Sequence, residues 1–312
     1  MTTPSLDIPL PTLADRPSTR RRLPPWLKRP LPGGVFVPTA TTVLASGVAT
    51  VCEEAKCPNR TECWSAGTAT FMVMGDRCTR RCGFCSVATA RPDRLSDDEP
   101  ARLATAAQRM ALDHVVITAV ARDDLLDEGA DHLHHCIVAV RSALPSATIE
   151  VLPADLHAEP TRIARVCDAR PDVYNHNIET VERLSRDVRP QAAYRRSLDV
   201  FRVVRQVAAD DIVTKSGIMV GLGETRDELR RTFDDLVAAG VMILTVGQYL
   251  QPSRDHLPVQ RYVPPAEFDT LADDARSAGF AAVASGPFVR SSYHAGEVLA
   301  EVRRRREEAS HV

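Results

Sequence analysis

The sequence predicts a single α/β domain, built as a partial TIM-type barrel of six β/α units with an extension at each end. Of its 312 residues, 44% are hydrophobic and 26% are charged, so the chain can bury one sizeable core but not a large second domain. From Thr68 onward, short β-rich runs alternate with helical stretches, as expected of βα units around a parallel sheet. Polar segments follow the strands and would gather at the C-terminal rim, where barrel enzymes carry out chemistry.

The strand and helix candidates follow one another along the chain. The six strands are expected at 69–74, 114–118, 149–152, 172–177, 213–220 and 243–248. Crossover helices are expected at 127–144, 194–208 and 225–239, with a further helix at 265–278 after the last strand. A closed TIM barrel has eight strands, so this barrel is expected to be incomplete.

Two segments have a distinctive local composition. Residues 1–35 are rich in Pro and Arg, including the run Arg20, Arg21 and Arg22, and show no periodicity. We expect an extended arm, either a solvated terminus or a docking segment for an acidic partner. The glycine pair in Gly221-Leu222-Gly223-Glu224-Thr225 lacks the third glycine of a dinucleotide loop, and we interpret it as a tight strand-to-helix turn capped by Thr225.

Composition excludes several classes of function. The net charge of −2 excludes a globally basic nucleic-acid binder. There is neither an apolar run long enough to span a membrane nor a secretory h-region, so we expect a soluble cytoplasmic protein. Six of the eight cysteines fall between Cys52 and Cys85, which favours metal ligation over disulfides. The remaining two, Cys136 and Cys167, are isolated in helical patterns and are expected to be buried apolar residues.

The first cysteine triplet, Cys78, Cys82 and Cys85, has the spacing C-x3-C-x2-C and follows the first predicted strand. A cubane has four irons, so three thiolates leave one iron open to a non-protein ligand, whereas electron-carrier clusters usually have all four irons capped by cysteine. An open iron implies chemistry at the cluster. The alternative is a zinc site, which needs a fourth ligand.

The second triplet, Cys52, Cys57 and Cys63, has the spacing C-x4-C-x5-C and precedes the barrel. Taken alone, it is compatible with either a zinc knot or an iron–sulfur cluster.

The first triplet, with Phe84 before its third cysteine, resembles the signature of radical S-adenosylmethionine (SAM) enzymes, and its combination with the second triplet resembles the lipoyl synthase family. The resemblance implies a barrel of the radical SAM type, a [4Fe–4S] cluster on Cys78, Cys82 and Cys85 whose open iron chelates SAM, and an auxiliary [4Fe–4S] cluster on Cys52, Cys57 and Cys63. The fourth auxiliary ligand would be Ser292, in Arg290-Ser291-Ser292-Tyr293. The alternative for Ser291 and Ser292 is an N-cap of a following helix.

The reaction that this resemblance implies is insertion of two sulfur atoms at C6 and C8 of a protein-bound octanoyl-lysine, with the auxiliary cluster as sulfur donor. Its catalytic residues would be Cys78, Cys82, Cys85 and Ser292. Its partners would be an octanoylated lipoyl carrier, which is a lipoyl domain or a glycine-cleavage H-type protein, an electron donor such as flavodoxin or ferredoxin, and an iron–sulfur carrier that repairs the cluster. Neither nucleic acid nor membrane is expected.

The resemblance extends over residues 24–295. Thr118, Asn177, Glu179 and Lys215 are the candidate SAM contacts, each with an ordinary rim hydrogen bond or ion pair as the alternative. One departure is Leu152-Pro153-Ala154-Asp155-Leu156, where relatives have Pro-Asp-Phe after a hydrophobic residue, so the proline is displaced by one. The rim geometry there is expected to differ.

We divide the chain into an N-terminal extension (1–50), an auxiliary-cluster segment (51–67), the barrel (68–285) and a C-terminal segment (286–312). Three other functions compete with the one implied above: a radical SAM enzyme that sulfurates another substrate, a non-catalytic iron–sulfur electron carrier and a zinc-binding structural protein. Cleavage of SAM would exclude the last two.

Overall fold

The computed structural model describes residues 22–28, 41, 43, 47–55, 57, 59–65, 70–293 and 295–310. Most of the predicted N-terminal arm, including Arg20 and Arg21, lies outside this part of the chain. Within it, the 3-10 helix η2 (Pro25–Leu27) buries Leu27.

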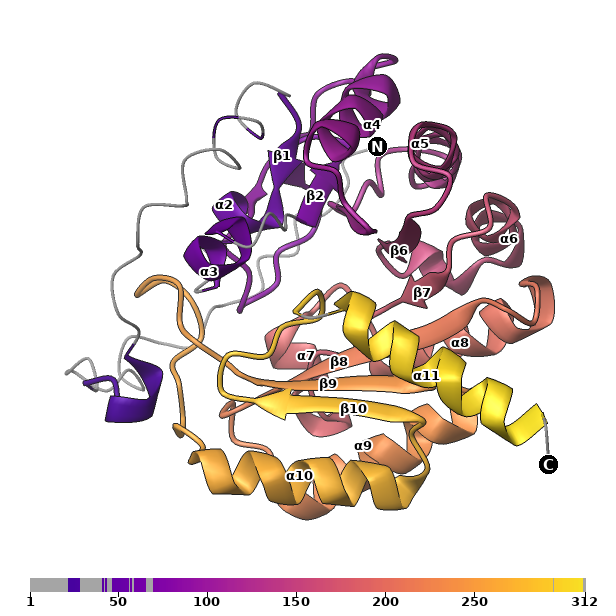
Figure 1. The fold of residues 1–312 in the computed structure, drawn as a ribbon. Helices are drawn as coiled ribbons and strands as arrows, with labels where there is room; N and C mark the ends of the chain where they lie inside the picture. The colour runs from indigo at the N-terminus through magenta and orange to yellow at the C-terminus, as the bar shows by residue number, and fades with distance from the viewer. Residues whose placement is uncertain are drawn as a thin grey trace, which may run out of the picture.

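The fold is built on one eight-stranded sheet that curves through the molecule (Figure 1). Seven strands are parallel, and β1 joins the sheet antiparallel to β2. In sheet order the strands are β1 (Ala49–Thr50), β2 (Thr70–Val73), β5 (His114–Ala119), β6 (Thr148–Leu152), β7 (Val173–Asn175), β8 (Val213–Val220), β9 (Ile243–Gln248) and β10 (Ala282–Gly286). Among the described residues β1 does not pair with β10, so the barrel is partial, as predicted.

All six predicted strands are present in the expected order, and the predicted 213–220 and 243–248 coincide with β8 and β9. Prediction missed β1 and β10. A separate two-stranded sheet joins β3 (Arg77–Cys78) to β4 (Ala88–Thr89).

Helices follow the strands and cover the outer face of the sheet (Figure 1). They are α4 (Glu99–Arg109), α5 (Ala130–Ala143), α6 (Pro160–Asp168), α7 (Glu182–Val188), α8 (Tyr194–Val207), α9 (Arg226–Ala239) and α10 (Pro265–Ala278). The four helices predicted from the sequence correspond to α5, α8, α9 and α10. Two short helices, α2 (Val51–Glu54) and α3 (Arg60–Ser65), precede β2, and the 3-10 turn η3 (Leu156–Ala158) follows β6.

The last helix, α11 (Ala295–Ser310), closes the end of the barrel opposite the rim. Its Leu299 and Val302 pack in one buried cluster with the first residues of four strands, Val173, Val213, Ile243 and Ala282. The amino ends of these strands are therefore sealed by apolar contacts, and the carboxyl ends remain available for chemistry.

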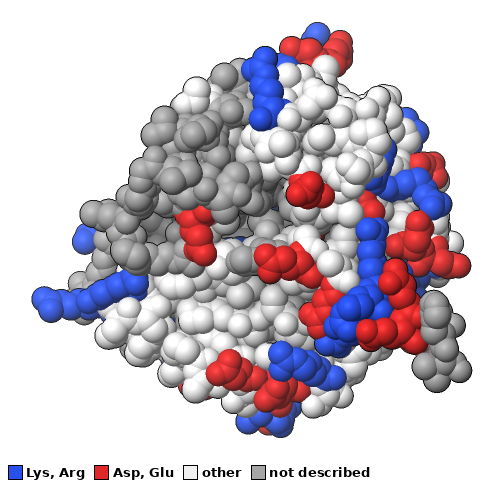
Figure 2. Space-filling view, in the orientation of Figure 1, with Lys and Arg blue, Asp and Glu red and all other residues white. Residues whose placement is uncertain are grey.

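Charged side chains of both signs alternate over the exposed face of α11 (Figure 2), where Arg304 pairs with Glu308 and Arg305 with Glu301. The face shown therefore carries no extended basic surface there of the kind that binds nucleic acid. No helix within the described ranges combines the length and apolar character needed to cross a bilayer.

The glycine-pair segment forms the predicted turn. Gly221 and Gly223 have φ of +100° and +107°, a left-handed conformation that glycine adopts without a side-chain clash. The Glu224 carboxylate accepts the peptide N–H groups of Gly221 and Leu222, and Thr225 forms a capping box with Glu228. Since Glu224 occupies these N–H groups, the turn is closed by its own side chain.

The two isolated cysteines are buried as predicted, Cys136 at 0% and Cys167 at 3% exposure. Burial raises the pKa of both thiols, that of Cys167 to about 12, so both stay protonated and inert.

Candidate functional site

The first cysteine triplet lies on the loop that follows β2, at the carboxyl end of the parallel sheet. Met74 and Gly75 turn the chain at the end of the strand with φ of 68° and 91°. The Met74 N–H donates to the Glu99 carboxylate at 2.9 Å, which stabilises this left-handed turn. Cys78 ends β3, and Cys82 and Cys85 follow in the loop before β4.

Neighbouring rim segments hold this loop from several sides. The Thr79 N–H donates to Ala121 O after β5, and the Gly83 N–H donates to Val188 O at the end of α7. Leu257 N donates to Gly83 O at 2.9 Å, and a Cβ on Gly83 would lie 2.9 Å from the Leu257 side chain. A larger residue at position 83 would therefore push the loop away from its support.

The sulfur atoms of the loop are half-buried and receive peptide hydrogen bonds. Arg80 N donates to Cys78 Sγ at 3.4 Å, and the Val87 peptide N–H donates to Cys85 Sγ. Burial raises the pKa of Cys82 to about 12 and that of Cys85 to about 11, and the negative charge of Glu179 contributes to both shifts. Cluster binding must therefore displace protons from these thiols.

The sulfur atoms of each triplet are not arranged as the ligands of a single metal ion. Within the described part of the chain, neither triplet brings its three Sγ atoms within 4.8 Å of one another. Zn–S bonds of about 2.3 Å in a tetrahedral site would hold thiolates roughly 3.8 Å apart. A cubane binds each cysteine to a different iron and separates the sulfurs further, so the spacing of the sulfur atoms gives no support to a single zinc ion on either triplet.

Two of the candidate SAM contacts, Asn177 and Glu179, lie together beside this loop. Glu179 has a φ of 64°, and its backbone is pinned to β8 by hydrogen bonds with Gly217 O and Met219 N. Burial raises the pKa of Glu179, against the opposing charge of Arg189, a hydrogen bond from Asn177 and the charge of Arg290. Asn177 Oδ1 is buried without a hydrogen-bond partner and would lie 2.7 Å from a Cβ on Gly217. An unsatisfied buried acceptor at the rim is available to a ligand donor.

The other two candidates, Thr118 and Lys215, already have protein partners. Thr118 Oγ1 donates to Leu152 O at 2.8 Å. Lys215 is 1% exposed, and its ammonium donates to both oxygens of Glu150, at 2.8 and 3.1 Å. For these two residues the structure contains the hydrogen bond and the ion pair that were the alternatives to SAM contact.

The second triplet lies on α2, the turn after it and α3. Cys57 N donates to Cys52 O, and Cys63 N donates to Asn59 O. Cys52 is 6% exposed and belongs to a small buried cluster that Cys63 also contacts. All eight cysteines lie within the described residues, and none forms a disulfide.

The C-terminal Arg-Ser-Ser-Tyr segment reaches this second triplet. Asn59 is 1% exposed and donates from Nδ2 to Phe288 O at 2.6 Å. The Tyr293 hydroxyl donates to Glu62 on α3 at 3.0 Å. The two contacts flank Ser291 and Ser292, so the serines lie in a turn attached to the auxiliary segment at both ends.

The same C-terminal segment also reaches the rim. A Cβ on Gly247, in β9, would lie 2.1 Å from Val289 O, so the segment lies directly against this strand. The Arg290 charge also acts on Glu179. Helix α11 begins at Ala295, so neither serine stands at its N-cap position.

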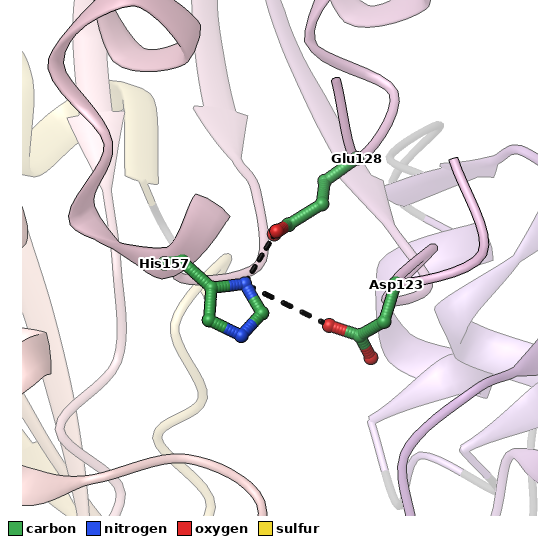
Figure 3. A group of neighbouring side chains, drawn as sticks. All are labelled: Asp123, Glu128 and His157. Carbon is green, nitrogen blue, oxygen red and sulfur yellow. Dashed lines mark hydrogen bonds and ion pairs between the residues drawn. The ribbon is translucent and has the colours of Figure 1, made fainter. Parts of the chain in front are cut away.

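Sequence reasoning missed a group of charged residues beside the first triplet. Asp123, Glu128 and His157 bring one ligand atom each within 4.8 Å of the others (Figure 3). Arg80 contacts Asp123 at 2.6 Å, and Arg162 pairs with Glu128. Because guanidinium groups already neutralise both carboxylates, this group is an ion-pair network rather than a metal site. The only sequence signal was the position of Arg80 inside the cysteine motif.

A second network that sequence reasoning missed is largely buried. Arg189 donates to Asn177 O at 3.0 Å and to Ser197 Oγ, and Ser197 also contacts His176 Nε2 at 3.0 Å. Burial lowers the pKa of His176 to about 4, so its ring is neutral near pH 7.

Comparisons with known proteins agree with this geometry. The family model for the radical SAM superfamily matches residues 72–236. A lipoyl synthase of Rhodopirellula baltica is 54% identical over 284 residues, covering 90% of this chain and 89% of the relative. A lipoyl synthase of Bacillus cereus strain B4264 is 50% identical over 291 residues, covering 93% of this chain and 97% of the relative.

Among solved structures, the [FeFe]-hydrogenase maturase HydG has a TM-score of 0.54 at 15% identity, covering 74% of this chain and 54% of that one. Streptococcus suis SuiB bound to precursor peptide SuiA has a TM-score of 0.53 at 11% identity, covering 69% of this chain and 48% of that one. These two structures support the fold alone. By its superfamily match and by its identity with these relatives over nearly its whole length, the chain belongs to the lipoyl synthase family of radical SAM enzymes.

Proposed function

We propose that the chain inserts two sulfur atoms at C6 and C8 of a protein-bound octanoyl-lysine, forming the lipoyl group. The observation that carries the proposal is the path of the C-terminal segment. It is hydrogen-bonded to the auxiliary segment at Phe288 and Tyr293, and between these contacts Arg290 acts on the rim residue Glu179. This path supports placing both cysteine triplets beside one site, as a reaction that needs a radical on one side and a sulfur donor on the other requires.

We assign the metal-binding roles as follows. Cys78, Cys82 and Cys85 would hold the [4Fe–4S] cluster that binds SAM, and Cys52, Cys57, Cys63 and Ser292 would hold the auxiliary cluster. When bound, the first cluster and SAM supply a 5′-deoxyadenosyl radical that abstracts hydrogen from carbon. An alkoxide is a hard ligand that is lost easily from an iron otherwise bound by sulfur, and this suits a cluster consumed as sulfur donor.

The chain's own residues would orient SAM. Asn177 offers a buried acceptor, and Glu179, beside it, is held in one backbone conformation by β8. An acceptor pair of this kind suits the ammonium or ribose hydroxyl groups of SAM. Thr118 and Lys215 would stabilise the barrel wall beside Asn177 and Glu179. Thr118 does so through its hydrogen bond to Leu152, and Lys215 through its ion pair with Glu150.

We propose that the substrate is an octanoylated lipoyl carrier and that Arg20, Arg21 and Arg22 help to bind an acidic surface on it. The run of charge supports this, and Arg22, within the described segment 22–28, is exposed. Replacing the three arginines with glutamine should raise KM for the carrier and reduce its salt dependence, with kcat for an octanoyl peptide unchanged. Unchanged KM and salt dependence would contradict a docking role.

We also propose protein partners, a cellular compartment and a division of the chain. A flavodoxin- or ferredoxin-type protein would supply electrons, and an iron–sulfur carrier would restore the auxiliary cluster. The cysteines proposed to hold the clusters must stay reduced, which suits a reducing compartment such as the cytoplasm. The division at residues 50, 67 and 285 is likewise proposed, with 51–67 carrying the auxiliary cysteines.

An anaerobic single turnover tests the function. The chain is reconstituted with iron and sulfide and mixed with octanoyl-lysyl peptide, SAM and dithionite, and the products are separated by mass spectrometry. We expect lipoyl peptide and 5′-deoxyadenosine. Formation of 5′-deoxyadenosine with no sulfur on the peptide, in protein carrying about eight irons, would show that the substrate is a different one.

A further inference from the structure

We propose that Arg80 is a positioning residue for the SAM-binding cluster, orienting the peptide N–H that donates to Cys78 Sγ and so setting the cluster's reduction potential. The proposal rests on Cys78, Cys82 and Cys85 holding that cluster. Arg80 is the second residue after Cys78. Its peptide N–H donates to Cys78 Sγ, whereas its guanidinium contacts Asp123 and Asp155.

The guanidinium of Arg80 is fixed between two carboxylates. Its Nε donates to Asp123 at 2.9 Å and its Nη2 donates to the same carboxylate at 2.6 Å, which makes a bidentate pair. Its Nη1 lies 2.8 Å from Asp155 Oδ1. Arg80 is 7% exposed, so the group is held on two sides with little access for water.

The Asp155 carboxylate is itself held rigidly. It is 1% exposed, and Oδ2 accepts from Arg196 at 2.8 Å. Burial alone would raise the pKa of Asp155, but the charges of Arg80 and Arg196, together with that of His176 at the low pH where it is protonated, outweigh burial and lower the pKa to about 2. Asp155 is therefore a permanent anion shared by two guanidinium groups.

An unusual turn follows Asp155. Leu156, His157 and Ala158 have φ of 44°, 50° and 53°, three consecutive left-handed residues that are not glycine. A left-handed backbone is unfavourable for such residues, because their Cβ comes close to the following carbonyl oxygen. His157 contacts Glu128 (Figure 3). Arg162 contacts the same carboxylate, and the two contacts hold the turn in place. A strained turn of this kind persists only where several contacts fix the local structure. Here the contacts with Glu128 fix the turn that follows Asp155, the partner of Arg80.

The peptide groups of Arg80 connect this fixed side chain to the loop that carries the first cysteine triplet. Arg80 N donates to Cys78 Sγ at 3.4 Å, and Arg80 O accepts from Thr89 Oγ1 at 3.2 Å. A hydrogen bond to a cluster sulfur stabilises the more negative, reduced state and raises the reduction potential. Loosening the Arg80 side chain should therefore weaken this bond and lower the potential.

The chain provides a matched control in Arg81. It is the next residue and carries the same charge, yet its side chain is exposed, and no ion pair or hydrogen bond of its guanidinium occurs among the residues that the structure describes. A substitution at position 81 changes the charge of the loop without removing an anchor.

The test uses the full chain with Cys52, Cys57 and Cys63 replaced by alanine, so that only one cluster is measured. About four irons per chain are expected. Absence of iron from this parent would contradict the assignment of the cluster ligands, and not the role of Arg80. Midpoint potential is measured by electron paramagnetic resonance during redox titration, together with the rate of 5′-deoxyadenosine formation.

We expect Arg80→Gln to lower the potential and to slow 5′-deoxyadenosine formation about tenfold, and Arg81→Gln to change neither. Arg80→Lys, which keeps the charge but not the two-sided contact, should also lower the potential, and it replaces Arg80→Gln if that variant does not fold.

The variant Asp155→Asn distinguishes the positioning of Arg80 from the direct effect of a nearby charge on the reduction potential. Removing a negative charge near the cluster would by itself raise the potential, whereas loosening Arg80 lowers it. We expect a lower potential. A higher potential in Asp155→Asn, or equal effects of Arg80→Gln and Arg81→Gln, would overturn the proposal.

Discussion

The hydroxyl of Tyr293 donates to the Glu62 carboxylate at 3.0 Å, joining the C-terminal Arg-Ser-Ser-Tyr segment to the helix that carries Cys63. The two residues are 231 positions apart in the sequence. Because Ser292 precedes Tyr293, this bond helps to hold the proposed serine ligand beside the auxiliary cysteines.

Tyr293→Phe should make the auxiliary cluster more labile while leaving the fold intact. The bond is exposed, so its loss should cost about 0.5 kcal/mol, corresponding to roughly twofold faster loss of auxiliary iron to a chelator. Tyr262→Phe is the control, since Tyr262 is half-buried and its hydroxyl has no hydrogen bond within the described ranges. Equal rates in the two variants would mean that Tyr293 does not support the cluster.

Gly247→Ala should displace the C-terminal segment from β9, because the new Cβ would lie 2.1 Å from Val289 O. We expect destabilisation of about 1–3 kcal/mol in denaturant unfolding. Lipoyl product should be lost while 5′-deoxyadenosine still forms. In Gly286→Ala the nearest atom is a side-chain methyl of Val289 at 3.3 Å, so a much smaller effect is expected. Normal product from Gly247→Ala would contradict the role given to this segment.

Stability should fall as the pH decreases from 7 to 5, because His176 is buried in its neutral form with a pKa of about 4. The unfolded chain, with a histidine pKa near 6.5, binds more protons in this window, so stability rises with pH between these two values. The loss from pH 7 to 5 should be about 2 kcal/mol. Denaturant unfolding of the apo protein under reducing conditions measures it. In His176→Gln, the loss of stability between pH 7 and pH 5 should be smaller by about 2 kcal/mol.

Breaking the pair between Lys215 and Glu150 should destabilise the barrel strongly. Lys215→Met leaves a buried carboxylate without its cation, at a cost of about 3–5 kcal/mol in denaturant unfolding. The double variant Lys215→Met/Glu150→Gln should recover much of this. If Lys215 acts only through Glu150, the double variant binds SAM with the affinity of the parent. A large loss of SAM affinity in a stable double variant would instead show that Lys215 contacts SAM directly.

The sequence predicted most of the strands because segments such as β8 and β9 are rich in β-branched and aliphatic residues, which favour strands. It missed β10, which reads Ala-Val-Ala-Ser-Gly and has only one β-branched residue, and β1, which has two residues and is defined only by its partner β2. A strand that is held only by pairing with its neighbour leaves little signal in its own local sequence.

The site was predictable to the extent that its residues are close in sequence. Both cysteine triplets were visible as motifs, whereas the partners of Arg80 come from loops after β5 and β6, and nothing local connects them. The displaced proline at Pro153 was the one local sign of unusual rim geometry, and the turn of left-handed residues begins three positions later at Leu156. The link between Tyr293 and Glu62 required the folded chain.

The source of the inserted sulfur tests the central claim most directly. The chain is reconstituted with sulfide of a heavy sulfur isotope and freed of excess sulfide. It is then given octanoyl-lysyl peptide, SAM and dithionite for one turnover in medium that contains ordinary sulfide. If the cluster on Cys52, Cys57, Cys63 and Ser292 is the donor, both sulfur atoms of the lipoyl product carry the heavy isotope. A lipoyl product without the heavy isotope, formed by fully loaded protein in medium containing ordinary sulfide, would show that the sulfur comes from elsewhere.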